Sequence, residues 1–108
     1  MVLLDFWATW CGPCIKKMPE VEQLYGKYHD RGFVVIGIHS ARGDETAEEF
    51  VKNAKVTFPI ALDNGKTHES FAIEAVPTYI LVDKKGKVAR SPSHNPPTTE
   101  EIERLLSE

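Results

Sequence analysis

The residues that most constrain the fold are the first 28, where an apolar run leads into two closely spaced cysteines and a long amphipathic segment. Residues 2–7 are almost continuously apolar, which is typical of a strand buried on both faces. Residues 12–28 carry apolar side chains at helical spacing. Pro13 suits the first helical turn, where its missing N–H has no partner, and Pro19 should kink the helix. The pattern therefore predicts a strand and a helix with the cysteines at their junction.

The rest of the chain continues this alternation of strands and helices. We expect strands over 33–39 and 58–62, a hairpin formed by 78–82 and 87–89, helices beginning at Thr46, over 67–73 and at Thr98, and a loop over 91–97. Thr46 with Glu49, and Thr98 with Glu101, have the spacing of capping boxes. Strands alternating with helices, closed by a hairpin, predict one α/β domain over residues 1–108, a three-layer α/β/α sandwich with a mixed sheet of about four strands.

Composition excludes several classes of protein. The 108 residues carry a net charge of −3, which argues against a nucleic-acid partner bound through its phosphates. No apolar run reaches the ~18 residues that a membrane span needs. Two cysteines form neither a disulfide-rich scaffold nor a four-thiolate zinc site, so we expect no metal. The chain opens inside a predicted strand without a signal peptide, which suggests a shortened domain. Its compartment stays open: cytoplasmic, or extracytoplasmic with the signal or anchor absent.

The two cysteines are the sharpest chemical feature of the sequence. Cys11 precedes a predicted helix, where unpaired N–H groups and the helix dipole stabilise a thiolate and lower the thiol pKa. Cys14 lies one turn further on and can reach back to Cys11. Cys11 is therefore the candidate attacking thiolate and Cys14 the resolving thiol of a disulfide exchange reaction. Two alternatives remain open, a zinc half-site and an inert structural disulfide.

The stretch from Phe6 to Cys14 resembles the active-site segment of the thioredoxin superfamily. Residues 34–39 and 82–86 are similar to the branch that includes the TlpA and ResA proteins. The resemblance implies a monomeric dithiol–disulfide oxidoreductase without a cofactor, which reduces protein disulfides through a mixed disulfide and receives electrons from an upstream reductase. It leaves two alternatives: an extracytoplasmic TlpA-like reductase with a narrow client, as in cytochrome maturation, and a redox-inactive binding module.

The resemblance also implies roles for particular residues. Pro77 should be cis, with the backbone of Val76 presented to the substrate chain, and Asp5 should take the proton of Cys14. The alternative is that Asp5 is a purely structural carboxylate within an apolar strand. We expect Trp10 to flank the cysteines, although core packing is the alternative. The residues expected to contact substrate are Trp10, Gly12, Pro13, Val76 and Pro77.

Three departures from the family pattern limit what can be transferred. Lys17 stands where ResA-type proteins have an acid, and Gly37 stands where many thioredoxins have a lysine facing the buried aspartate. The strand and helix that precede the active-site strand in thioredoxins are missing here. Trp7 is interpreted as a core residue, and His39 is given no role.

Overall fold

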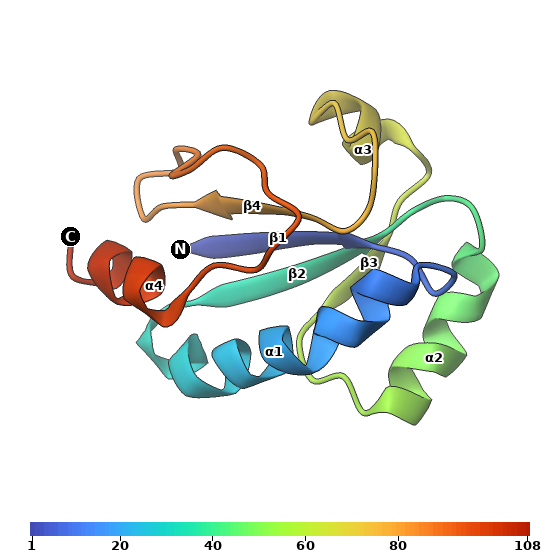
Figure 1. The fold of residues 1–108 in the computed structure, drawn as a ribbon, viewed down its shortest axis with the longest axis horizontal. Helices are drawn as coiled ribbons and strands as arrows, with labels where there is room; N and C mark the ends of the chain where they lie inside the picture. Colours follow the sequence, from blue (N-terminus) through green and yellow to red (C-terminus); the bar gives the residue numbers. More distant parts are fainter.

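Four strands form one mixed sheet (Figure 1). The computed structural model describes all of residues 1–108. The strands are β1 (Val2–Trp7), β2 (Val34–His39), β3 (Ile60–Leu62) and β4 (Thr78–Val82), in the order β3-β2-β1-β4. β1 pairs with β2 in parallel and with β4 antiparallel, and β2 pairs with β3 in parallel. The predicted mixed sheet of four strands is confirmed, and β1, which leads to the cysteines, is a central strand.

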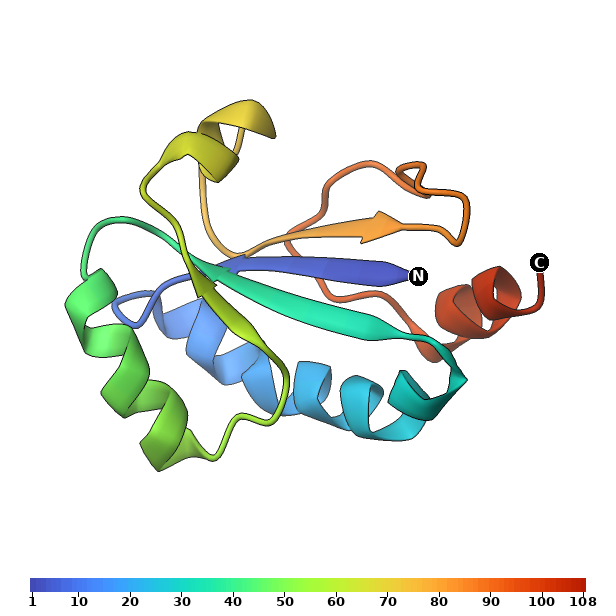
Figure 2. The same ribbon diagram turned by 180° about the vertical axis from the view of Figure 1, so that it is seen from behind.

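The helices cover the two faces of the sheet unequally. α1 (Gly12–Tyr28) and α2 (Ala47–Ala54) lie on one side, and α3 (Lys66–Ser70) lies on the other (Figures 1 and 2). α4 (Thr99–Leu106) buries Ile102, Leu105 and Leu106 in the same cluster as the apolar face of α1. The α/β/α layering is therefore present, with α3 and the residues after it as the only cover on the second face.

Side chains alternate between the two faces along β1, as the period of a strand requires. Leu3 and Trp7 belong to the main core under α1, and Asp5 lies between them on the same face. Phe6 points the other way and forms a smaller buried cluster with Ile38 and Ile80. The alternation places Asp5 on the side of the sheet that faces α1.

Several predicted boundaries need correction. The helix expected over 67–73 ends at Ser70, because the chain turns at Ala72, whose φ is 54°. The strand expected from Phe58 begins only at Ile60. The second strand of the predicted hairpin is reduced to one bridge, between Val82 and Val88.

The two predicted capping boxes have different outcomes. Thr98 Oγ1 accepts the N–H of Glu101, and the Glu101 carboxylate accepts the N–H of Thr98, so this box is confirmed. The box at Thr46 is wrong. Thr46 precedes α2, but its side chain makes no capping bond; its hydroxyl donates instead to the carbonyl of Gly43 at 2.6 Å.

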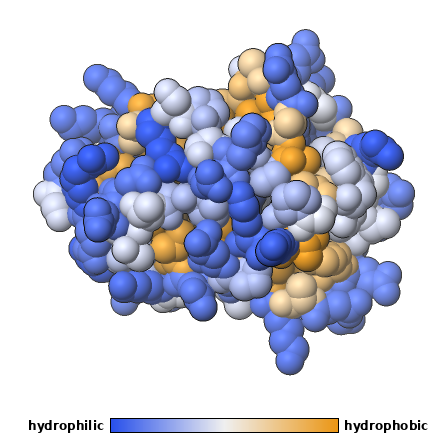
Figure 3. Space-filling model, in the orientation of Figure 1, coloured by the Kyte–Doolittle hydropathy of each residue, from blue (hydrophilic) through white to orange (hydrophobic).

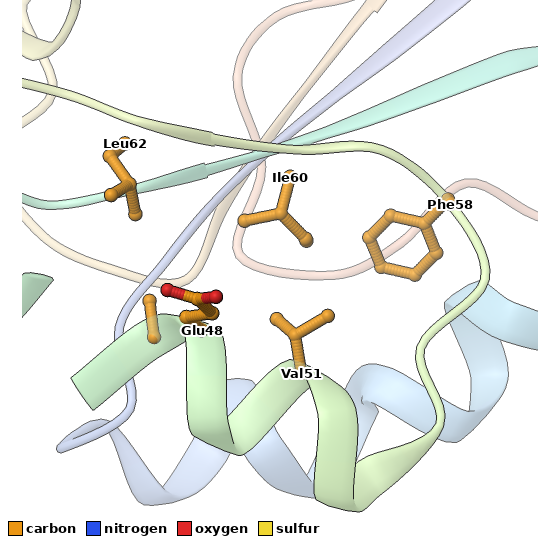
Figure 4. A pocket seen from close by; sticks show the side chains of 6 residues that line it. Glu48, Val51, Phe58, Ile60 and Leu62 are labelled. Carbon is orange, nitrogen blue, oxygen red and sulfur yellow. The ribbon is translucent and has the colours of Figure 1, made fainter. Parts of the chain in front are cut away.

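The surface is largely hydrophilic on the face drawn in Figure 3, with small apolar areas between charged side chains. An apolar cavity of about 380 Å³ lies between α2 and β3, lined by Val51, Phe58, Ile60 and Leu62 with Glu48 at its edge (Figure 4). It includes neither cysteine, so it is separate from the candidate active site. None of the helices combines the length and the apolar character needed to cross a membrane.

Candidate active site

Cys11 and Cys14 form a disulfide at the start of α1, with their Cα atoms 5.3 Å apart. Cys11 is the N-cap residue, in an extended conformation, and its Sγ accepts the N–H of Cys14 at 3.2 Å. The first turn contains no acidic side chain, and Pro13 takes up its expected place there. In the reduced protein a thiolate on Cys11 would keep this donor and the positive end of the helix dipole.

Both cysteines are buried, whereas the two residues between them are exposed. Cys11 is 5% exposed and Cys14 2% exposed, so both are buried in the disulfide form. Gly12 and Pro13, between them, are exposed. A substrate would therefore approach Cys11 over these two residues.

The loop before β4 lies directly against Cys11. The Val76–Pro77 peptide bond is cis, as expected. The carbonyl oxygen of Val76 lies 3.6 Å from Cys11 Sγ, so residues 65 positions apart meet at the reactive sulfur. The Pro77 carbonyl accepts a hydrogen bond from Nδ1 of His94 at 2.6 Å. Since a carbonyl can only accept, Nδ1 of His94 carries the proton, and the ring holds the proline loop in place.

Lys17 donates hydrogen bonds to the loop after β4 that contains His94. Its Nζ donates to the carbonyl of His94 at 2.7 Å and to Oδ1 of Asn95 at 2.8 Å. Where ResA-type proteins have an acid, this chain has a cation that ties α1 to the residues supporting Pro77. The role of that acid cannot be transferred to Lys17, which donates hydrogen bonds but cannot accept them.

Trp10 lies at the surface beside Cys11 and is not a core residue. Its side chain is 49% exposed, and its indole N–H donates to the carbonyl of Arg42 at 2.8 Å. The Arg42 guanidinium lies 5.0 Å from the ring centroid, in cation–π contact. Core packing of Trp10 is therefore wrong, and Trp7, which is fully buried, is the core tryptophan.

Asp5 is buried on the face of β1 that α1 covers, and its hydrogen bonds are incomplete. The residue is 2% exposed, and its Oδ1 has no partner. Burial raises the pKa of its carboxyl group to about 7. Its neighbour on β4, Tyr79, has a raised pKa because of burial first, and because of the negative charges of Asp5 and Glu20 second.

Gly37 is the partner of Asp5 on β2, and the structure explains why no lysine stands there. A Cβ at Gly37 would lie 2.6 Å from Cδ1 of Ile60 and 3.1 Å from Cε1 of Phe58. Phe58 precedes β3 and Ile60 is its first residue, so this edge of the sheet fills the space a side chain would need. Asp5 therefore has no cation opposite it on β2.

Three further residues shape the site: His39 and His94, which had no predicted role, and Thr46, which was predicted only to cap a helix. His39 Nε2 accepts the N–H of Thr9 at 2.9 Å, and Thr9 Oγ1 lies 2.6 Å from Thr46 Oγ1. These contacts join residues 30 and 37 positions apart, and no local pattern signals them. No group of three or more His, Cys, Asp or Glu side chains is placed to hold a metal ion.

The fold, with a cysteine pair at the start of α1, is that of a thioredoxin-like domain, and solved structures agree with this. StoA from Bacillus subtilis superimposes with a TM-score of 0.80 at 28% identity, over 99% of this chain and 81% of that one. The thioredoxin domain of a thiol-disulfide oxidoreductase from Bacteroides vulgatus gives a TM-score of 0.83 at 26% identity, over 97% of this chain and 78% of that one.

A sequence model of the Redoxin family matches residues 1–106, and the chain belongs to this family. The thiol-disulfide oxidoreductase ResA of Bacillus thuringiensis is 37% identical over 97% of this chain and 61% of that protein. ResA of Halalkalibacterium halodurans is 34% identical over 82% of this chain and 51% of its own length. The chain therefore spans between half and about three fifths of these relatives.

Proposed function

We propose that this chain is a thiol-disulfide oxidoreductase that reduces disulfides in protein substrates. The observation that carries the proposal is the Cys11–Cys14 pair at the start of α1, with the Val76 carbonyl 3.6 Å from Cys11 Sγ. The names of the related proteins support the same class of activity. An inert structural disulfide is disfavoured, because a loop of two residues between cysteines adds little constraint to the unfolded chain.

The first step is attack by Cys11. Its thiolate attacks one sulfur of the substrate disulfide, which forms a bond between Cys11 Sγ and that sulfur and releases the other as a thiolate. The Cys14 N–H, 3.2 Å from Cys11 Sγ, favours the ionised form of the attacking group. The exposed Gly12 and Pro13, with Trp10 and the Val76–Pro77 loop around them, offer the contact surface for the substrate chain.

The second step is attack by Cys14 on the mixed disulfide. Asp5 accepts the Cys14 proton, and the Cys14 thiolate bonds to Cys11 Sγ while the substrate sulfur leaves with the bonding pair. Two electrons thus pass from the dithiol to the substrate. Asp5 suits this role because it lies on the same face of β1 as Leu3 and Trp7, which pack in one core cluster with Cys14. Its pKa of about 7 also lies near neutrality. An upstream reductase is required to restore the dithiol.

Residues 1–108 are proposed to act as one domain and as a monomer. The reductive direction is inferred from Gly12 and Pro13, since a Gly-Pro pair between the cysteines is similar to reducing thioredoxins. A client restricted to one protein is also compatible with the site. A redox-inactive binding module is disfavoured because both cysteines are present and bonded to each other.

The test is reduction of insulin in the presence of dithiothreitol, with Cys11→Ser as the inactive control. We expect wild-type protein to accelerate insulin precipitation and Cys11→Ser to leave it at the uncatalysed rate. Cys14→Ser should accumulate a mixed disulfide between Cys11 and its substrate, because the resolving thiol is gone. No acceleration by the reduced wild-type protein, or equal trapping by both serine variants, would contradict the proposal.

A further inference from the structure

We propose that His39 is a positioning residue that holds the turn delivering Cys11 to the active site, a proposal that rests on the function inferred above. Residues 8–11 form a turn closed by a hydrogen bond from the Cys11 N–H to the Ala8 carbonyl, at 3.2 Å. Thr9, inside this turn, donates its N–H to Nε2 of His39 at 2.9 Å. The imidazole therefore contacts the same short turn that ends at Cys11.

The two hydrogen bonds of His39 define its protonation state. A backbone N–H can only donate, so Nε2, which faces Thr9, must be the unprotonated nitrogen. Nδ1 lies 2.7 Å from the Ser40 carbonyl, which can only accept, so Nδ1 carries the proton. The neutral ring with its proton on Nδ1 satisfies both contacts, and no other form does.

The position of the ring is itself fixed. His39 is fully buried at the end of β2, opposite Trp7 at the end of β1. The two rings meet edge to face with their centroids 4.9 Å apart. β1 and β2 therefore end side by side. Because His39 belongs to β2, its hydrogen bond with Thr9 connects the sheet to the turn that follows β1.

Two further contacts hold the same turn from the loop after β2. Thr9 Oγ1 is hydrogen-bonded to Thr46 Oγ1 at 2.6 Å, and the Trp10 indole donates to the Arg42 carbonyl. A Cβ at Gly43 would lie 3.0 Å from the Trp10 ring, which shows how closely the loop and the ring approach. His39 provides the only one of these three contacts that is made by a fully buried side chain.

Loss of the His39 contact should change the chemistry of Cys11. Without it the Thr9 N–H has no acceptor, and the turn can leave the geometry that holds Cys11 at the N-cap of α1. Cys11 then spends less time aligned with the Cys14 N–H, so its thiolate is less stabilised. We expect slower alkylation of Cys11 and a higher pKa for its thiol.

A matched pair of variants separates the acceptor from the ring. Both His39→Gln and His39→Asn remove the contact with Trp7. Gln can place a carbonyl oxygen near the position of Nε2 and keep an acceptor for Thr9, whereas Asn can replace only the Nδ1–H donor to Ser40. We expect His39→Asn to lower the Cys11 alkylation rate at pH 7 by about threefold to tenfold, the effect of one net hydrogen bond, and His39→Gln to retain more of it.

Two measurements on the wild type decide the proposal even if the variants fold poorly. Hydrogen exchange of the Thr9 N–H should be slow, and the ¹⁵N shifts of His39 should show an unprotonated Nε2. Fast exchange or a protonated Nε2 would overturn the proposal, as would equal alkylation rates for folded Gln and Asn variants. Alkylation needs no protein substrate, so failure of the wild type to reduce insulin would contradict the proposed function alone.

Discussion

Asp5 carries a buried carboxyl group, and its protonation couples stability to pH. The folded protein raises the pKa from 3.8 to about 7 through burial. The native state therefore binds a proton more tightly than the unfolded chain does. The contribution of Asp5 to stability is complete below pH 4 and is lost as the pH rises through 7, because the charged form must then be buried.

The first prediction is that Asp5→Asn stabilises the protein at alkaline pH. The neutral amide removes the penalty of burying charge, so the free energy of unfolding at pH 8 should rise by up to roughly 4 kcal/mol, from a shift of about three pKa units. At pH 4 the two proteins should be nearly equal. Denaturant unfolding of both proteins from pH 4 to pH 8 measures the difference.

The same variant separates the structural role of Asp5 from its proposed catalytic role. Resolution of the mixed disulfide by Cys14 should slow at neutral pH, while the first attack by Cys11 stays close to wild type. Single-turnover kinetics resolve the two steps. If both the resolution rate and the stability are unchanged, Asp5 neither transfers the proton of Cys14 nor carries a penalty for burying charge.

The second prediction concerns Gly37, where a side chain has no room. Gly37→Ala should lower the free energy of unfolding by about 1–3 kcal/mol, because Ile60, Phe58 and Trp7 all crowd the new methyl group. Gly26 is the matched control, since it is exposed in α1 with no atom within 4 Å of the added Cβ. Gly26→Ala should stabilise the protein by about 0.5–1 kcal/mol through helix propensity. Equal effects at both sites, measured by urea unfolding, would contradict the crowding argument.

At the scale of the elements, the two Thr-x-x-Glu patterns show where local sequence stops being decisive. Thr98 has no competing partner and caps α4. Thr46 has the same pattern, but its hydroxyl bonds to Gly43 and Thr9 instead. Nothing near Thr46 in the sequence distinguishes the two cases, because Thr9 is 37 residues away. Tertiary contacts decide which acceptor or donor a cap residue takes.

The third prediction is that the cap at Thr98 contributes measurably to stability. Thr98→Ala removes a hydrogen bond to the Glu101 N–H and should lower the free energy of unfolding by about 1 kcal/mol. Thr99→Ala, one position later, removes no side-chain cap and should have almost no effect. A loss for Thr99→Ala as large as that for Thr98→Ala, in thermal or urea unfolding, would show that the cap is not the cause.

At the scale of the whole molecule, the sequence predicted those features that depend on a single segment of the chain. β1, α1, β2 and β4 were predicted from their own apolar periods, and the cysteine pair from its place between a strand and a helix. The contacts that complete the site could not be predicted, because they join distant segments. Hydrogen bonds join His39 to Thr9, His94 to Pro77 and Lys17 to Asn95 only once the sheet order and the helix packing are established.

The sheet itself divides the molecule into a strongly packed face and a weakly covered one. The main core combines β1, β2 and β4 with α1 and α4, and it contains 17 buried residues. The second face has a cluster of 3 buried residues, with Leu4, Ile36 and Val82 only partly buried around it. Since burial of apolar area is the main favourable term in folding, the face under α1 should provide most of the stability.

The last prediction compares two adjacent valines on β2 that point to opposite faces. Val35 is fully buried on the α1 face, whereas Val34 is 41% exposed. Val35→Ala removes two buried methyl groups and leaves a cavity, so the free energy of unfolding should fall by about 2–3 kcal/mol. Val34→Ala makes the same chemical change at the surface, where the loss of β propensity should cost less than about 1 kcal/mol. Urea unfolding of both variants, followed by far-ultraviolet circular dichroism, measures the ratio. Equal losses at the two positions would mean that the second face of the sheet is covered in solution by more than α3, and the division into a strong and a weak face would then be wrong.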